Sequence, residues 1–263
     1  MVRVACCWDD GAVNDIRLIG LLRKYKAKAT FNLNPGLMPE HTETPRWLAP
    51  GEKFWNYQDI RNMIDREGRF APGEKCWHYQ GYVNGKVGLR EMKEVYEGFQ
   101  VASHGWFHLG GSADPQAFIK DALDARHYLE DVFQRECPGY AWPFGDATPA
   151  AARLLKEAGF LYGRTTRNTD NVGFTDAPLR LDPSCHHADR GFYDKFRAAK
   201  EASGIFYFWG HSFEMLDCDG LWDQLERKLA FISGDPETEW IDVIDIVRPE
   251  TTKNSGSKFP GEK

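Results

Sequence analysis

The sequence lacks the features that mark several common classes of protein. No apolar run approaches the roughly 20 residues that span a bilayer. The first residues show no basic region followed by an apolar stretch and a small-residue cleavage site. The formal net charge of -6 provides no basic surface for nucleic acid or for an anionic membrane. We therefore expect a cytoplasmic protein with neither a membrane nor a nucleic acid as partner.

Other motifs are also missing. The six cysteines show no CxxC spacing, which predicts reduced thiols rather than a disulfide framework. HExxH, the motif of zinc-dependent proteases, is absent, so we exclude that class. Aromatic residues, in contrast, make up 14% of the chain and include nine tryptophans. Most of them are expected in the core, but their flat faces also suit ring-shaped ligands.

Strand-like and helix-like segments alternate along most of the 263 residues. About seven strand–helix units predict an α/β fold with a parallel, barrel-like sheet. The expected strands are residues 2–7, 29–33, 99–103, 139–142, 160–166, 205–210 and 241–246. The expected helices are residues 15–25, 89–96, 150–158, 193–202 and 221–232, and one that opens at Asp114–Pro115.

Two segments depart from this alternation within an expected single domain of residues 1–248. Residues 35–88 are rich in Pro, Gly, Trp and Tyr, with one expected helix at 57–66 and a near-repeat of Ala-Pro-Gly-Glu-Lys at 49–53 and 71–75. This segment is either an elaborated loop that serves as a lid over the barrel mouth or a self-packed aromatic unit. Residues 249–263 are polar and predict a flexible C-terminal tail.

Titratable residues and turn formers follow five of the expected strands. They are Asp9-Asp10, His104 and His108, the turn 143–146, Arg164, and His211. In a parallel barrel the carboxyl ends of all strands meet at one rim, which is where active sites form. The opposite strand ends carry much less of this chemistry, and this asymmetry indicates an enzyme.

His104 and His108 can share a metal ion, because residues four apart lie on one face of a helical turn. Alone, this spacing more often pairs a surface histidine with a core histidine. Adjacent carboxylates point apart in an extended backbone, so one of Asp9 and Asp10 can bind metal while the other serves as a base. The alternative is a helix N-cap beside a solvated neighbour. The pair 186–187 is expected in a loop, with one histidine half-buried.

The set WDDG, SHGWFH, PFG and WGH, in this order from Asp9 to His211, resembles the motifs of the polysaccharide deacetylase family. The resemblance implies a distorted (β/α)7 barrel and one divalent metal ion, usually zinc. It also implies removal of N- or O-acetyl groups from sugars such as chitin, peptidoglycan or xylan.

Carried over to this chain, the resemblance gives each motif residue a role. Asp9 resembles the catalytic base and His211 the general acid. The metal ligands would be Asp10, His104 and His108. Phe144, with Gly145 in the same turn, resembles the residue whose backbone N–H holds the oxyanion, while Tyr207 and Trp209 replace aliphatic pocket residues.

The chain departs from the family pattern at three points. Gly105 replaces a small hydroxyl residue whose side chain supports the metal loop. Ala141 stands where an arginine usually orients the base, and the Asp-Trp element that supports this arginine is not recognisable. Arg164, at the end of the next strand, could supply the missing guanidinium; alternatively it pairs with Asp170 or Asp176.

These observations predict a metal-dependent hydrolase that removes an acetyl group from an amino sugar or an oligo- or polysaccharide, with N-acetyl favoured over O-acetyl. One alternative is a metal-dependent hydrolase of a non-sugar amide or cyclic imide on the same scaffold. Another is an inactive carbohydrate-binding relative, motivated by the altered arginine. The sequence leaves the oligomeric state open.

Overall fold

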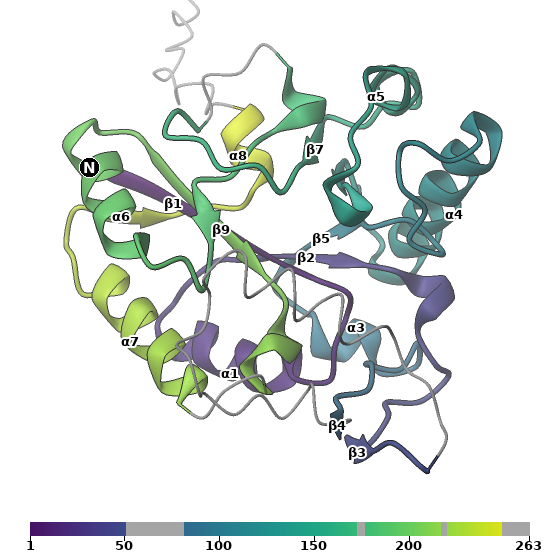
Figure 1. Cartoon of the computed structure of the whole chain (residues 1–263), viewed down its shortest axis with the longest axis horizontal. Helices are drawn as coiled ribbons and strands as arrows, with labels where there is room; N and C mark the ends of the chain where they lie inside the picture. The colour runs from purple at the N-terminus through teal and green to yellow at the C-terminus, as the bar shows by residue number, and fades with distance from the viewer. Residues whose placement is uncertain (51–81, 173–176, 217–219, 249–263) are drawn as a thin grey trace, which may run out of the picture.

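The computed structural model describes residues 1–50, 82–172, 177–216 and 220–248. Its centre is a curled sheet in which every neighbouring pair of strands is parallel, as Figure 1 shows. The strand order is β7-β6-β5-β2-β1-β9-β8. The strands are β1 (Val2–Asp9), β2 (Thr30–Leu33), β5 (Gln100–Ser103), β6 (Gly139–Ala141), β7 (Tyr162–Arg164), β8 (Cys185–His186) and β9 (Ile205–Gly210).

The two edges of this sheet are joined by the segment that leads into β8. Leu181 exchanges backbone hydrogen bonds with β7, because its N–H donates to Gly163 and its carbonyl accepts from Thr165. A few residues later, β8 pairs with β9. The sheet therefore curls into a distorted barrel of seven strands, which confirms the expected fold class. β8 itself was not expected from the sequence.

Helices lie outside the curled sheet, except for α8, which lies at its amino-terminal end (Figure 1). They are α1 (Asp15–Lys24), α3 (Met92–Val95), α4 (Pro115–Phe133), α5 (Pro149–Glu157), α6 (Phe192–Glu201), α7 (Leu221–Ser233) and α8 (Ile244–Val247). Short 3-10 turns also occur: η1 (Pro35–Leu37), η3 (Pro143–Gly145), η4 (Pro178–Arg180) and η5 (Ser212–Leu216). The expected N-cap is confirmed, since the Asp114 side chain accepts from two N–H groups in the first turn of α4.

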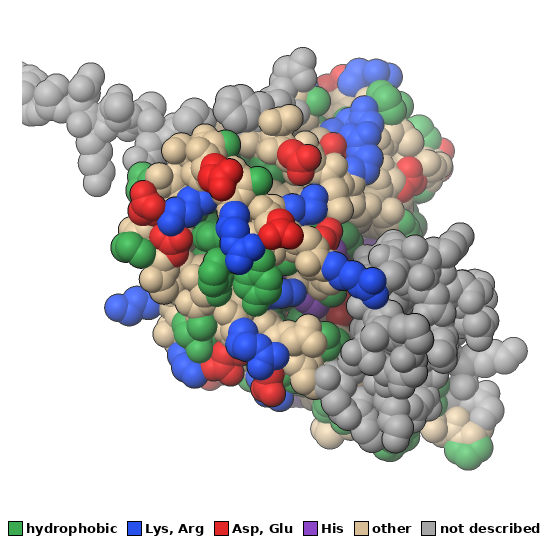
Figure 2. Space-filling view, turned by 60° about the vertical axis from the view of Figure 1, so that its left-hand side comes forward, with side chains coloured by type: hydrophobic (Ala, Val, Ile, Leu, Met, Phe, Trp, Pro, Cys, Tyr) green, Lys and Arg blue, Asp and Glu red, His purple; other side chains and the backbone are tan. Residues whose placement is uncertain are grey.

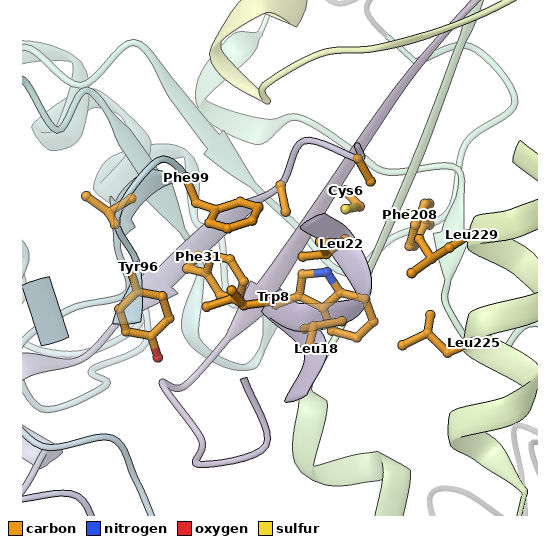
Figure 3. Packing of buried hydrophobic residues seen from close by; sticks show 14 of the residues in the cluster. Cys6, Trp8, Leu18, Leu22, Phe31, Tyr96, Phe99, Phe208, Leu225 and Leu229 are labelled. Atoms are coloured by element: carbon orange, nitrogen blue, oxygen red, sulfur yellow. The ribbon is translucent and has the colours of Figure 1, made fainter. Parts of the chain in front are cut away.

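β1 is buried on both faces, as expected for the central strand of a parallel sheet. Its alternate side chains Cys6 and Trp8 face outward and pack with α1 and α7, as Figure 3 shows for Leu18, Leu22 and Leu225. The side chains between them face the inside of the barrel. Ala5 and Cys7 pack there with Tyr162, Tyr207 and Trp209. This period of two decides which way each strand end points.

The amino-terminal end of the barrel is closed by the segment expected as a last strand at 241–246, and that prediction was wrong. The strand lies earlier, as β10 (Thr238–Trp240), which pairs with the first residues of β1. The chain then turns under the barrel into α8, and Ile241, Val243 and Ile246 join the interior cluster. Apolar spacing alone does not distinguish a strand from such a plug.

The segment 35–88 is described only at its two ends. Arg46–Trp47 (β3) pairs antiparallel with Tyr82–Val83 (β4). The helix expected at 57–66, the second copy of the near-repeat and the tail at 249–263 lie outside the described residues. Among the helices that are described, none combines the length and the apolar character needed to cross a membrane.

Candidate metal centre and active site

At the carboxyl ends of four strands, the last inward-facing residue has a titratable side chain. On β1, Asp9 follows Ala5 and Cys7 on the inward face. By the same period of two, His104 follows Ala102, Arg164 follows Tyr162, and His211 follows Trp209. The residues that the sequence placed at strand ends therefore meet at one rim.

Asp10, His104 and His108 form a group of ligand atoms that lie within 4.8 Å of one another. His104 Nε2 and His108 Nε2 are 3.1 Å apart. Asp10 Oδ1 lies 3.8 Å from the first of these nitrogens and 3.9 Å from the second. Two imidazoles and one carboxylate are the ligand set of many catalytic zinc sites, in which a further position stays open for water or substrate.

The protonation of the two histidines suits a metal ligand. His104 Nδ1 lies 2.8 Å from the Ala141 carbonyl, which is an acceptor, so Nδ1 carries the proton of the neutral ring. Nε2, which faces His108 and Asp10, is therefore free of a proton. Burial lowers the pKa of His104, and burial together with His104 lowers that of His108 to about 3. Both rings are therefore neutral at neutral pH. Figure 2 shows histidine side chains on its face only as small purple areas between other side chains.

Asp10 reaches the same centre as Asp9 because the backbone reverses at this residue. Asp10 has φ +77°, in the left-handed region that non-glycine residues rarely adopt. Its N–H donates to the Asn32 carbonyl (3.0 Å), and its carbonyl accepts from Lys86 Nζ (2.7 Å). The expectation that the two carboxylates point apart was wrong for this reason: His104 Nε2 lies 3.9 Å from Asp9 Oδ2 and 3.8 Å from Asp10 Oδ1.

Asp9 is buried and held by two donors. Asn32 Nδ2 donates to Oδ1 (2.7 Å), and the Arg164 guanidinium forms an ion pair with Oδ2. Burial would raise the pKa of Asp9, but Arg164 and then His104 and His211 outweigh burial and lower it. Asp9 is thus an ionised carboxylate in a fixed orientation.

Arg164 therefore contacts Asp9 from a strand other than the one that carries Ala141. Of the alternative partners, Asp170 lies near Lys195 instead (3.6 Å), and Asp176 is outside the described residues. Arg164 also lies over the Trp209 ring, 4.8 Å from its centroid. Trp209 is only 7% exposed, so its face supports the guanidinium rather than an open pocket.

His211 faces Asp9 and Asp10 with one nitrogen and Glu214 with the other. Its Nε2 lies 3.8 Å from Asp9 Oδ2 and 3.9 Å from Asp10 Oδ2. Its Nδ1 lies 3.1 Å from Glu214 Oε1, and its backbone N–H donates to Oε2 (3.0 Å). Burial opposes the charged form, but Glu214 and the two aspartates raise the pKa of His211 to about 9. Glu214 was missed by the sequence reasoning, although His211 and Glu214 are three residues apart in one turn.

His186 and His187 surround the same carboxylate, contrary to the expected loop with one half-buried histidine. Both are buried, and each Nε2 lies 2.8 Å from Glu214 Oε2. His186, His211 and Glu214 also have the residue types of a metal site. However, the Ala188 N–H donates to His186 Nδ1 (3.2 Å), which places the proton of a neutral ring on Nε2, toward Glu214. We therefore interpret the cluster as a hydrogen-bond network around Glu214.

The loop that carries His104 and His108 is held by Asp121 of α4. Its carboxylate accepts from the backbone N–H groups of Phe107 (2.7 Å) and Leu109 (3.4 Å). Gly105 has φ +75°, and a Cβ at this residue would collide with the Asp121 carboxylate. The glycine and the aspartate thus replace the hydroxyl support that the family pattern has at this position.

The turn η3 presents Phe144 beside the centre. Phe144 has φ +58°, and its ring centroid lies 4.5 Å from that of His108. The two hydrogen bonds of the turn are donated by Gly145 and Asp146, so neither uses the Phe144 N–H. Gly145 has φ +69° and approaches Thr166 so closely that a Cβ would clash.

Comparisons with known proteins agree with the fold. Residues 2–163 match the family model described as polysaccharide deacetylase. A putative polysaccharide deacetylase from Mycobacterium smegmatis has a TM-score of 0.61 at 17% identity, over 99% of this chain and 95% of its own. A probable polysaccharide deacetylase from Pseudomonas aeruginosa has a TM-score of 0.57 at 13% identity, over 94% and 90%.

The match to Streptococcus pyogenes deacetylase PplD in complex with acetate is more limited. Its TM-score is 0.46 at 18% identity, and it covers 67% of this chain. This chain thus spans 61% of the length of that protein. No curated protein matches the sequence.

Proposed function

This chain belongs to the polysaccharide deacetylase family, and from that premise we propose that it is a metal-dependent hydrolase that removes an N-acetyl group from an amino sugar or a short oligosaccharide. The observation that carries the proposal is the convergence on one rim of three ligand-type side chains, a buried carboxylate and a third imidazole. Asp10, His104 and His108 make up the first group, and Asp9 and His211 flank it.

The donor set fits a divalent cation, and we propose zinc. Neutral imidazole nitrogens and a carboxylate oxygen within 4.8 Å of one another are the ligands that zinc takes in catalytic sites. When bound, such an ion polarises the acyl carbonyl and lowers the pKa of a water molecule. His104, His108 and Asp10 would hold it, and the bond from His104 to the Ala141 carbonyl keeps the first ring in a ligating orientation.

Asp9 acts as the general base in this proposal. Its pKa is lowered, so it is ionised at neutral pH and can accept the proton of the attacking water. Arg164 and Asn32 fix the carboxylate, which restricts the base to one orientation. Arg164 thereby takes over the task that the family assigns to an arginine at the position of Ala141, which argues for an active enzyme over an inactive carbohydrate-binding relative.

His211 acts as the general acid. Its pKa of about 9 keeps the imidazolium form at neutral pH, and Glu214 holds Nδ1 so that Nε2 faces the centre. An amine leaves poorly unless it is protonated, whereas an alcohol leaves more readily. A strongly protonated acid therefore favours N-acetyl over O-acetyl substrates. The Phe144 N–H would stabilise the oxyanion, because the turn leaves it out of its own hydrogen bonds.

Acetate release tests the proposal directly. Purified protein is offered N-acetylated and O-acetylated sugars of graded length, together with a simple amide and a cyclic imide, before and after treatment with a chelator. We expect release from N-acetyl sugars that stops with chelation and returns with zinc. Turnover of only the amide or the imide would instead support a non-sugar hydrolase on the same scaffold.

Two variants separate the metal from the base. Asp9→Asn should lose roughly a hundredfold or more in rate and keep its zinc, because Asp9 is not a ligand. His104→Ala should lose the zinc itself. If Asp9→Asn released the metal, or if His104→Ala bound zinc like the wild type, the assignment of roles would be wrong.

A further inference from the structure

The loop that carries His104 and His108 leaves the sheet beside the end of β2, which lies next to β5 in Figure 1. Leu33 is paired with Ser103, and its carbonyl accepts from the His104 N–H (3.0 Å). If the parallel ladder continued, the N–H of residue 35 would donate to the His104 carbonyl. Residue 35 is a proline, which has no N–H, so this donor is missing from the backbone.

Asn34 supplies the missing donor with its side chain. Its Nδ2 donates to the His104 carbonyl and also to the Gly105 carbonyl, the second at 3.1 Å. Asn34 is fully buried, and its Oδ1 has no hydrogen-bond partner among the described residues. A buried amide with an unpaired oxygen is unfavourable unless its donor is needed. The two carbonyls require that donor, and they fix the orientation of the amide, because an oxygen in place of Nδ2 would face two acceptors.

The backbone of this loop is therefore held at its carbonyl groups as well as at its N–H groups. Asp121 accepts from two N–H groups further along the loop, whereas Asn34 binds the carbonyls at its start. The backbone at this start is easily turned, because Gly105 has no side chain and adopts φ +75°. Without the Asn34 amide, the peptide that carries the His104 ring would lose its orientation. His104 Nε2 would then no longer be fixed at 3.1 Å from His108 Nε2.

We propose that Asn34 is a positioning residue of the metal centre, which holds the backbone of His104 and Gly105 so that the two histidines meet one ion. It acts through the loop, because both of its hydrogen bonds go to backbone carbonyls. The inference rests on the proposed function only in placing a metal ion at this site. Partners that orient metal ligands change metal affinity about tenfold to a hundredfold. The metal affinity of the folded protein, and not only its stability, therefore depends on Asn34.

The test measures zinc binding by competition with a chromophoric chelator, so that the result does not depend on activity. Asn34→Leu, which has a similar shape but no donor, should weaken zinc binding about tenfold to a hundredfold. Asn34→Ser keeps one hydroxyl donor and should weaken zinc binding by about tenfold, and this variant decides the test if the leucine variant does not fold. Cobalt(II) in place of zinc should show an altered visible spectrum in both variants, because the arrangement of the ligands changes.

Gln100→Met is the matched control, because Gln100 lies at the other end of β5. Its amide oxygen accepts from Thr30 Oγ1 (2.6 Å) and from the Ile244 N–H (3.3 Å), and neither donor belongs to the metal loop. This variant should unfold at a lower urea concentration than the wild type. Its zinc affinity and its cobalt spectrum should stay those of the wild type.

Folded Asn34 variants with the zinc affinity and the cobalt spectrum of the wild type would overturn the positioning role, even if the wild type releases acetate. An equal loss of zinc affinity in Gln100→Met would also overturn it, because the loss would then follow stability alone. A wild type that binds zinc but releases no acetate, together with Asn34 variants that bind zinc weakly, would support the positioning role and refute the deacetylase function instead.

Discussion

Arg164→Met is the substitution that tests the reasoning about the base most directly. Arg164 and Asp9 form a buried ion pair, with side chains 1% and 2% exposed. Methionine replaces the aliphatic part of arginine but has no guanidinium and no charge, so Asp9 would keep only the hydrogen bond from Asn32. Removing one partner of a buried pair costs about 3–5 kcal/mol, because the remaining charge has no compensation.

The protein can relieve this cost by binding a proton at Asp9. One pKa unit corresponds to about 1.4 kcal/mol, so a relief of 3–5 kcal/mol corresponds to a rise of roughly 2–4 units. Asp9 can act as a base only when it is ionised, and in the wild type Arg164 is the main cause of its lowered pKa. The acidic limb of the pH profile of kcat/KM should therefore move to higher pH by about two units. At pH values below the shifted limb, kcat/KM should fall about a hundredfold relative to the wild type. At alkaline pH the loss should be much smaller.

The assay is the pH dependence of acetate release, with zinc content and urea unfolding measured on the same samples. Arg164→Lys should shift the limb less, because it keeps the charge without the planar guanidinium. Arg167→Met is the control, since Arg167 is a surface arginine paired with Asp182, and its loss should change stability by no more than about 0.5 kcal/mol. A folded, zinc-loaded Arg164→Met protein with an unmoved acidic limb would refute the role of Arg164.

Three further changes follow from the site and its surroundings. Gly105→Ser restores the family pattern, but it should lower zinc affinity and cost about 1–3 kcal/mol of stability, because φ is +75° and the Asp121 carboxylate occupies the space of the new side chain. Unchanged zinc affinity would contradict this. Glu214→Gln should move the alkaline limb of kcat to lower pH, since Glu214 raises the pKa of His211; an unmoved limb would show another cause. Burial raises the pKa of Asp15 from 3.8 to about 7, so this group should lower the free energy of unfolding by about 1.4 kcal/mol for each pH unit between those values. Asp15→Asn should not show this fall when the two proteins are compared by urea unfolding.

The sequence by itself predicted the barrel and much of the rim. Alternating apolar residues identify strands, and a period of two carries each inward face to a defined last residue, such as Asp9 after Cys7 or His211 after Trp209. Parallel connectivity then brings all carboxyl ends to one rim. These relations depend on residues that are close together in the chain, so the sequence alone is enough to predict them.

Local pattern failed where the outcome depended on distant contacts. The segment at 241–246 has the apolar content of a strand, yet it forms a plug because the amino end of the barrel needs closing. The divergence expected for Asp9 and Asp10 holds for extended backbone, and it fails because Asp10 adopts φ +77° with its carbonyl held by Lys86. Neither the barrel opening nor the Lys86 contact is visible in the residues near these positions.

The partners of the buried charges were decided by tertiary structure alone. The sequence offered Arg164 as one candidate for the missing arginine, but only the curled sheet brings its guanidinium to Asp9, 155 residues away. Glu214 is a local partner of His211, three residues away, but only the closed sheet brings His186 and His187 to the same carboxylate. An ion pair inside a barrel depends on which strands become neighbours and on how far each extends, and these are properties of the closed sheet rather than of any one segment.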